Sequence, residues 1–118
     1  MERAAPSYHV VLIGIDVYSG GVPRLTGCVN DIDEIQKVLL ERLHVPKNRI
    51  KRFAAPLRDG TPRPKEVPTK APTQANLIAA LTALGDAVKP GDRVFIYHSG
   101  HGTRGEVINP VDNSRSYR

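Results

Sequence analysis

The chain of 118 residues has no tryptophan, few aromatic side chains and only one cysteine, Cys28. Aromatic residues make up 5% of the sequence, which disfavours the stacking platforms that bind single-stranded nucleic acid. A single cysteine excludes an internal disulfide bond, so the fold does not need an oxidising compartment. We therefore expect a cytoplasmic protein.

Long hydrophobic runs are also missing. Met1–Ser7 lacks the apolar stretch of a signal peptide, and every apolar run is far too short to span a bilayer. We therefore expect no association with a membrane.

The sequence has an excess of positive charge. Its net charge is +5 and its isoelectric point is about 9.7. The basic residues are scattered, and no expected helix carries a continuous basic stripe. We interpret them as a solvated surface and expect no nucleic-acid partner. A nucleic-acid-binding module remains a third alternative, which strongly salt-dependent binding would reveal.

Apolar periodicity predicts an alternation of strands and helices within one domain spanning residues 1–118. The expected elements are strand Tyr8–Asp16, helix Asn30–Leu43, strand Arg49–Ala54, helix Gln74–Val88 and strand Arg93–His98. This order predicts the α/β class, with a mainly parallel sheet flanked by helices on both faces. Right-handed crossovers are expected.

The helix limits rest on capping signals. Asn30 or Asp31 is the expected N-cap of the first helix, and Thr73 that of the second. The buried face of the second helix is expected to comprise Leu77, Ile78, Leu81, Leu84 and Val88. Residues 56–72 contain five prolines and are interpreted as an exposed loop. Residues 103–118 are expected to form an irregular tail.

His101 is the most informative candidate for catalysis. It stands between Gly100 and Gly102, directly after an expected strand. Ligands of parallel sheets bind beyond the carboxyl ends of the strands. We therefore expect three segments to converge there: the loop after Asp16, the segment around Cys28, and residues 99–102. A histidine in that position can act as an acid or a base, although a partly solvated loop histidine is an equal alternative.

Cys28 and Asp31 each have two interpretations from the residues alone. Cys28 is either a thiol activated by a helix N-terminus or, as we favour, a small buried side chain. Asp31 is either a helix cap, again the favoured interpretation, or a carboxylate that faces a basic ligand. The histidines and the cysteine lack metal-ligand spacing, and no GxSxG motif is present.

Four segments together resemble a known family. They are LIGIDVY (Leu12–Tyr18), LTGCVNDIDEIQKVL (Leu25–Leu39), PTQANLIAAL (Pro72–Leu81) and GDRVFIYHSGHG (Gly91–Gly102). Their order and spacing resemble those of caspase-like cysteine peptidases of family C14, most of all metacaspases and their bacterial relatives. The resemblance covers about residues 8–102 and corresponds to the large-subunit, p20-like portion.

The resemblance implies a role for each matching position. His101 matches the catalytic histidine, and the backbone N–H of Gly102 is implied to help form the oxyanion hole. Asp31 matches an aspartate of the S1 pocket that pairs with Arg or Lys. Cys28 matches a second cysteine near the site, and Asp16 would border the same cleft. No cofactor or metal is assigned to this chain, and calcium activation stays an open alternative.

One element of the family pattern is missing. The family's nucleophilic cysteine follows the histidine, whereas no cysteine follows His101 here. We therefore expect a Cys-dependent endopeptidase that acts on polypeptides after Arg or Lys but is inactive as this chain alone. A small subunit or C-terminal segment would supply the cysteine.

A terminus at Arg118 is what a basic-specific peptidase leaves when it processes itself, so Arg118 is the expected processing site. A truncated form remains open. The main alternative in function is an inactive caspase-like scaffold or partner-binding module.

Overall fold

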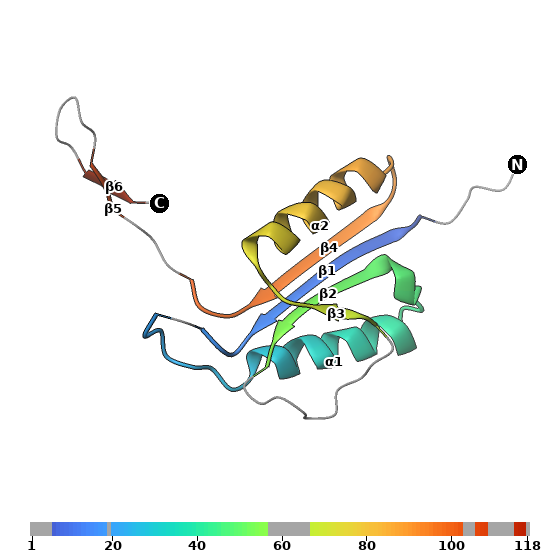
Figure 1. The fold of residues 1–118 in the computed structure, drawn as a ribbon. Coiled ribbons are helices and arrows are strands. Elements are labelled where there is room, and N and C mark those ends of the chain that lie inside the picture. The colour runs from blue at the N-terminus through green and yellow to red at the C-terminus, as the bar shows by residue number, and fades with distance from the viewer. Residues whose placement is uncertain (1–5, 19, 57–66, 103–105, 109–114, 118) are drawn as a thin grey trace, which may run out of the picture.

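The computed structural model describes residues 6–18, 20–56, 67–102, 106–108 and 115–117. The chain forms an α/β layer structure, as the sequence predicts (Figure 1). In chain order its elements are β1 (Tyr8–Ile15), α1 (Cys28–Glu41), a 3-10 turn (Lys47–Arg49), β2 (Ile50–Ala55), β3 (Thr69–Lys70), α2 (Gln74–Ala87), β4 (Arg93–Ser99), β5 (Glu106–Ile108) and β6 (Arg115–Tyr117).

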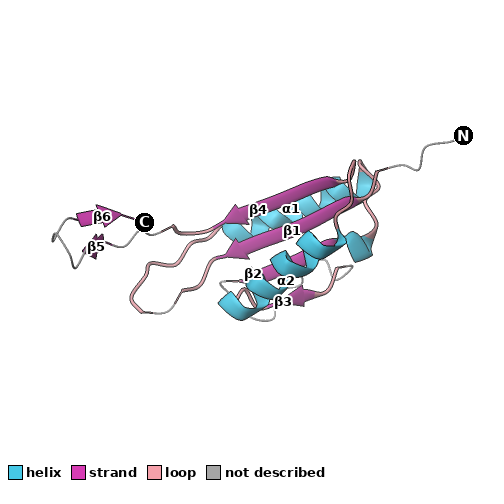
Figure 2. Ribbon diagram, turned by 90° about the horizontal axis from the view of Figure 1, so that it is seen from above, coloured by secondary structure: helices cyan, strands magenta, loops and turns pink. Residues whose placement is uncertain are grey.

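Strands β1 to β4 form one parallel sheet with the order β3-β2-β1-β4. The chain moves from β1 to β2 in one direction and then returns across β1 to reach β4. Right-handed crossovers in opposite directions place their helices on opposite faces. Helices α1 and α2 accordingly lie on opposite faces of the sheet (Figure 2). The carboxyl ends of β1 and β4 become neighbours, with Gly14 beside Ser99.

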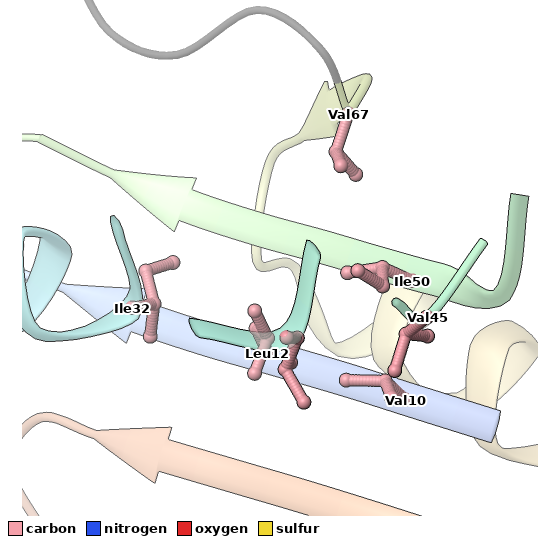
Figure 3. Packing of buried hydrophobic residues seen from close by; sticks show 7 residues of the cluster. Val10, Leu12, Ile32, Val45, Ile50 and Val67 are labelled. Atoms are coloured by element: carbon pink, nitrogen blue, oxygen red, sulfur yellow. The ribbon is translucent and has the colours of Figure 1, made fainter. Parts of the chain in front are cut away.

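The main core lies between the sheet and α1. Val10 and Leu12 of β1 pack there with Ile32 of α1 and with Ile50 and Val67 (Figure 3). Side chains alternate along a strand, so the intervening residues of β1 face α2. There Val11 and Ile13 pack with Phe53 and with partly buried α2 residues. Burial on both faces explains the unbroken apolar run of β1.

Helix α1 begins two residues earlier than expected, which corrects the predicted cap. Its N-cap position is Gly27, and Asp31 lies in the first turn without capping the helix. The carboxylate of Asp16 instead accepts a hydrogen bond from the Cys28 N–H, at 2.8 Å. The free amide of the helix start is therefore satisfied by the end of β1 and needs no cap of its own. An added Cβ at Gly14 would come within 2.7 Å of the Cys28 carbonyl oxygen, so this contact requires glycine.

Arg52 of β2 is a buried charge that the periodicity did not indicate, with 2% of its surface exposed. Its guanidinium donates to Asp33 and Gln36 of α1 and to Thr69 of β3. A buried guanidinium requires such partners. This network ties together three elements on the α1 face.

Two expected irregular segments contain structure. The prediction of an exposed loop over 56–72 is wrong at its C-terminal end, because Val67 is 1% exposed and Thr69–Lys70 pairs with β2. Residues 57–66 lie outside the described part. The tail expected over 103–118 contains the antiparallel pair β5 and β6.

Helix α2 matches its predicted limits to within one residue, and the Thr73 hydroxyl caps it by accepting from the Asn76 N–H. Its predicted buried face is only partly correct. Leu77 and Leu84 pack against the sheet, whereas Ile78 and Leu81 are 56% and 42% exposed. On the same face of the sheet, Val94 and Ile96 of β4 are also exposed, so among the described residues α2 covers only part of this face. None of the described helices is long and apolar enough to cross a membrane.

Candidate active site

The three segments expected to converge do meet at the carboxyl edge of the sheet. The loop after β1 and the segment after β4 extend from the same edge, close to the start of α1 (Figure 1). The Ser99 hydroxyl donates to Asp31 Oδ2 at 3.0 Å, which joins the end of β4 to the first turn of α1. His101 follows two residues later and contacts the loop after β1.

His101 is held by two residues of that loop. Its backbone N–H donates to the Tyr18 hydroxyl at 2.6 Å, and its ring Nε2 lies 2.9 Å from the Pro23 carbonyl oxygen. The Tyr18 and His101 rings meet edge to face, with centroids 5.1 Å apart. A carbonyl oxygen can only accept, so this geometry requires a proton on Nε2. In the neutral imidazole the other nitrogen, Nδ1, is then free of hydrogen and able to act as a base.

The loop that holds His101 is itself anchored to the sheet. The Asp16 N–H donates to the Ala55 carbonyl at 2.9 Å, and the Leu25 N–H donates to the Asp16 carbonyl at 2.8 Å. These two bonds hold both ends of the loop, where it leaves β1 and where it returns toward α1. Tyr18 and Pro23, which contact His101, lie between these two hydrogen bonds. The position of His101 is therefore linked to the end of β1.

Asp31 presents an exposed carboxylate in the first turn of α1. The positive end of the helix dipole favours a negative charge there. The bond from Ser99 uses one of about four lone-pair sites of the carboxylate. The remaining capacity suits a cationic ligand that approaches from solvent, and a guanidinium can bind such a carboxylate with two hydrogen bonds.

Asp16 and Cys28 lie beneath this surface. Asp16 is 2% exposed, and its carboxylate is engaged by the Cys28 N–H. Cys28 is a free, buried cysteine, in line with the favoured interpretation of a small buried side chain. These two residues therefore support the start of α1, from which Asp31 reaches solvent.

Gly102 and Arg118 are the two remaining predicted positions. Gly102 is described and exposed, directly after His101. Arg118 lies outside the described residues. Within the described residues, no three His, Cys, Asp or Glu side chains lie close enough together to hold a metal ion.

Three residues that contact the site were not predicted from the sequence to be site residues. Tyr18, Pro23 and Ser99 each contact His101 or Asp31. Pro23 acts through its backbone carbonyl, which every residue type carries, so no sequence signal marks it. Tyr18 and Ser99 did offer a signal, because each lies within three residues of an expected strand end.

A groove of about 950 Å³ lies elsewhere, between α2 and β2. Its walls include Phe53 and Leu84 and basic residues such as Lys47 and Lys70. No predicted site residue lines it. The site around His101 and Asp31 is thus a surface built from loops and a helix start, and it is distinct from this groove.

Comparison with known proteins identifies the family of this chain. A family model described as the metacaspase, peptidase C14 domain matches residues 9–116. Metacaspase-1 of Cryptococcus neoformans is 37% identical over 112 residues, covering 85% of this chain and 22% of that protein. Metacaspase-6 of Arabidopsis thaliana is 33% identical over 107 residues, covering 91% of this chain and 26% of that protein. The chain thus spans about a quarter of these relatives, and it belongs to the metacaspase family of C14 peptidases.

Proposed function

We propose that this chain supplies the acid–base part of a cysteine endopeptidase that cleaves polypeptides after Arg or Lys. The observation that carries the proposal is the geometry of His101. Its Nε2 is engaged by the Pro23 carbonyl, which leaves Nδ1 as the basic nitrogen at the edge of the sheet. Membership of the metacaspase family supports the same chemistry.

The nucleophile in this proposal is a cysteine outside this chain, on a second chain or a further segment. The combination of the two is called the assembled enzyme below. Nδ1 of His101 takes the proton of that thiol, and the thiolate attacks the scissile carbonyl carbon. The Gly102 N–H helps to stabilise the oxyanion that forms. The imidazolium then returns its proton to the leaving amine, which leaves an acyl-enzyme for water to hydrolyse. Throughout, the Pro23 carbonyl accepts the Nε2 hydrogen and stabilises the charged ring.

The preference for basic residues is assigned to Asp31. Its exposed carboxylate is held by Ser99 at the site edge, and a substrate guanidinium or ammonium group would pair with it there. Cys28 and Asp16 form the buried support of this pocket. Because their positions fix the start of α1, they would act on substrate binding through Asp31.

The unpaired side of β4 supports a requirement for further chain. Within the described residues β4 is an edge strand, and Val94, Phe95 and Ile96 are exposed at 46%, 41% and 51%. Edge strands with apolar side chains are ready to pair with another strand. We propose that the cysteine-bearing segment pairs along β4 and that the chain alone is inactive.

The proposed setting is the cytoplasm, with polypeptide substrates and without a nucleic-acid or membrane partner. The rival proposal is an inactive caspase-like scaffold or partner-binding module.

A labelling experiment separates the two proposals. The chain alone and the assembled enzyme are treated with an electrophilic inhibitor that ends in arginine, and turnover of an Arg-terminated fluorogenic peptide is measured. We expect turnover, and label on the added cysteine, only in the assembled enzyme. Label on Cys28, or an assembled enzyme without turnover, would overturn the proposed function. As a check on the thiol, Cys28→Ala should retain most of the turnover.

A further inference from the structure

Tyr18 makes two separate contacts with His101. The phenol oxygen accepts a hydrogen bond from the His101 backbone N–H at 2.6 Å, and the two rings meet edge to face at 64°. The first contact sets where the main chain turns, and the second limits how the imidazole can rotate. Edge-to-face packing is a favoured geometry for aromatic rings and has a directional preference.

Gly100 provides an independent sign of how tightly Tyr18 is fitted. A Cβ built on Gly100 would overlap the Tyr18 hydroxyl oxygen and would approach the His98 ring to 3.3 Å. A methyl group at this position would therefore displace the Tyr18 hydroxyl from where it accepts the His101 N–H. The Gly100 backbone, the Tyr18 hydroxyl and the His101 N–H form one closely packed unit.

The loop that carries Tyr18 is joined to the sheet by backbone hydrogen bonds. Tyr18 lies two residues after Asp16, whose N–H is bonded to Ala55 of β2 and whose carbonyl closes the loop with Leu25. Pro23, which accepts from the His101 ring, belongs to the same loop. One short segment thus fixes both the main chain and the ring of the histidine.

We propose that Tyr18 is a positioning residue that aims Nδ1 of His101 at the attacking thiol. This inference rests on the proposed function, in which His101 is the acid and base. A displacement of about 1 Å in such a group can lower a rate by about 100-fold. Tyr18 therefore acts on the chemical step and has little effect on substrate affinity.

The test compares two variants in the assembled enzyme. Tyr18→Phe keeps the ring and removes the hydroxyl, so we expect kcat to fall by about 10-fold with KM nearly unchanged, as for one lost hydrogen bond. Tyr18→Leu also removes the ring contact, and we expect a fall of about 100-fold. Tyr8→Phe is the matched control, because it removes a phenol hydroxyl at the opposite end of β1 and should leave kcat unchanged.

Gly100→Ala adds a readout that a general loss of stability would not produce. In the wild type the added methyl group displaces the Tyr18 hydroxyl, so kcat should fall by at least 10-fold. In the Tyr18→Phe background the overlapping oxygen is gone, and the same substitution should cost much less. The effects of the two changes on kcat should therefore be strongly non-additive.

The outcomes distinguish this inference from the proposed function. Full turnover in His101→Ala would overturn both. Loss of turnover in His101→Ala, combined with wild-type kcat in Tyr18→Phe and additive effects of Gly100→Ala, would overturn the role of Tyr18 alone. If Tyr18→Phe does not fold, Gly100→Ala decides the question by itself, because wild-type kcat in that folded variant contradicts the proposal.

Discussion

The carboxylate of Asp16, directly after β1, accepts a hydrogen bond from the backbone N–H of Cys28, the first residue of α1, at 2.8 Å. The bond is buried and spans the connection between strand and helix. It fixes the helix start from which Asp31 reaches the surface, so the stability of the fold and the geometry of the site depend on the same contact.

Removing this contact should destabilise the protein. Asp16→Ala leaves the Cys28 N–H buried without a partner, and we expect the free energy of unfolding to fall by about 1–3 kcal/mol. Asp16→Asn keeps an acceptor oxygen and should lose less. Urea unfolding of the assembled enzyme measures both, with the exposed Asp86→Ala as control. Equal midpoints for Asp16→Ala and Asp86→Ala would contradict the role of the bond.

His101→Ala should abolish turnover without unfolding the protein. Loss of a general acid and base typically lowers kcat by roughly 100- to 10,000-fold. The assay is turnover of an Arg-terminated fluorogenic peptide alongside circular dichroism. His98→Ala is the matched control, because His98 lies three residues earlier in β4 and has no role in the proposed mechanism. Near-normal turnover in a folded His101→Ala variant would remove this histidine from the mechanism.

Asp31→Asn should change substrate preference more than overall activity. The substitution removes the charge and keeps an oxygen that can accept from Ser99. Loss of one partner of a charge pair costs about 2 kcal/mol or more, so kcat/KM for Arg substrates should fall by roughly 30-fold. Neutral substrates should be affected far less. Glu34→Gln, an exposed neighbour on α1, serves as control. An unchanged ratio between Arg and neutral substrates would show that Asp31 does not select the basic residue.

Asp92 should make stability depend on pH at low values. It accepts hydrogen bonds from His9 Nε2 at 2.9 Å and from the Lys89 and Ser7 N–H groups. The bond from His9, followed by that from Lys89, lowers its pKa from 3.8 to about 2. A lowered pKa stabilises the fold above the ordinary value, and this contribution is lost as the pH falls toward 2.

The corresponding measurement compares wild type and Asp92→Asn by urea unfolding at several pH values. The variant should be less stable at pH 6, and the difference should shrink between about pH 4 and pH 2. The free energy of unfolding of the control variant Asp86→Asn should change with pH in the same way as that of the wild type across this range. A constant gap between Asp92→Asn and wild type would show that the carboxylate charge is not the cause.

Local patterns predicted the elements that depend on neighbouring residues. The apolar periodicity correctly marked β1 as a strand, and Thr73 correctly marked the start of α2. Burial of Arg52 was not predictable, because its partners on α1 lie 16 and 19 residues away and come close only in the folded chain. The contact of Tyr18 with His101 spans 83 residues, and the helix start is satisfied by Asp16 from outside the helix. Contacts of this kind follow from topology, which periodicity does not specify.

The position of β1 in the sheet has a consequence for the order of events during synthesis. This central strand pairs with β2 through Val10 and Ile50, and with β4 through Val10 and Phe95. The second partner is made 85 residues after Val10, which takes roughly 4 to 17 seconds at ribosomal speeds of about 5–20 residues per second. During this interval the most apolar strand of the chain has an open edge, and contacts of such long sequence separation also form slowly. The complete sheet can therefore form only late in synthesis, after β4 has emerged.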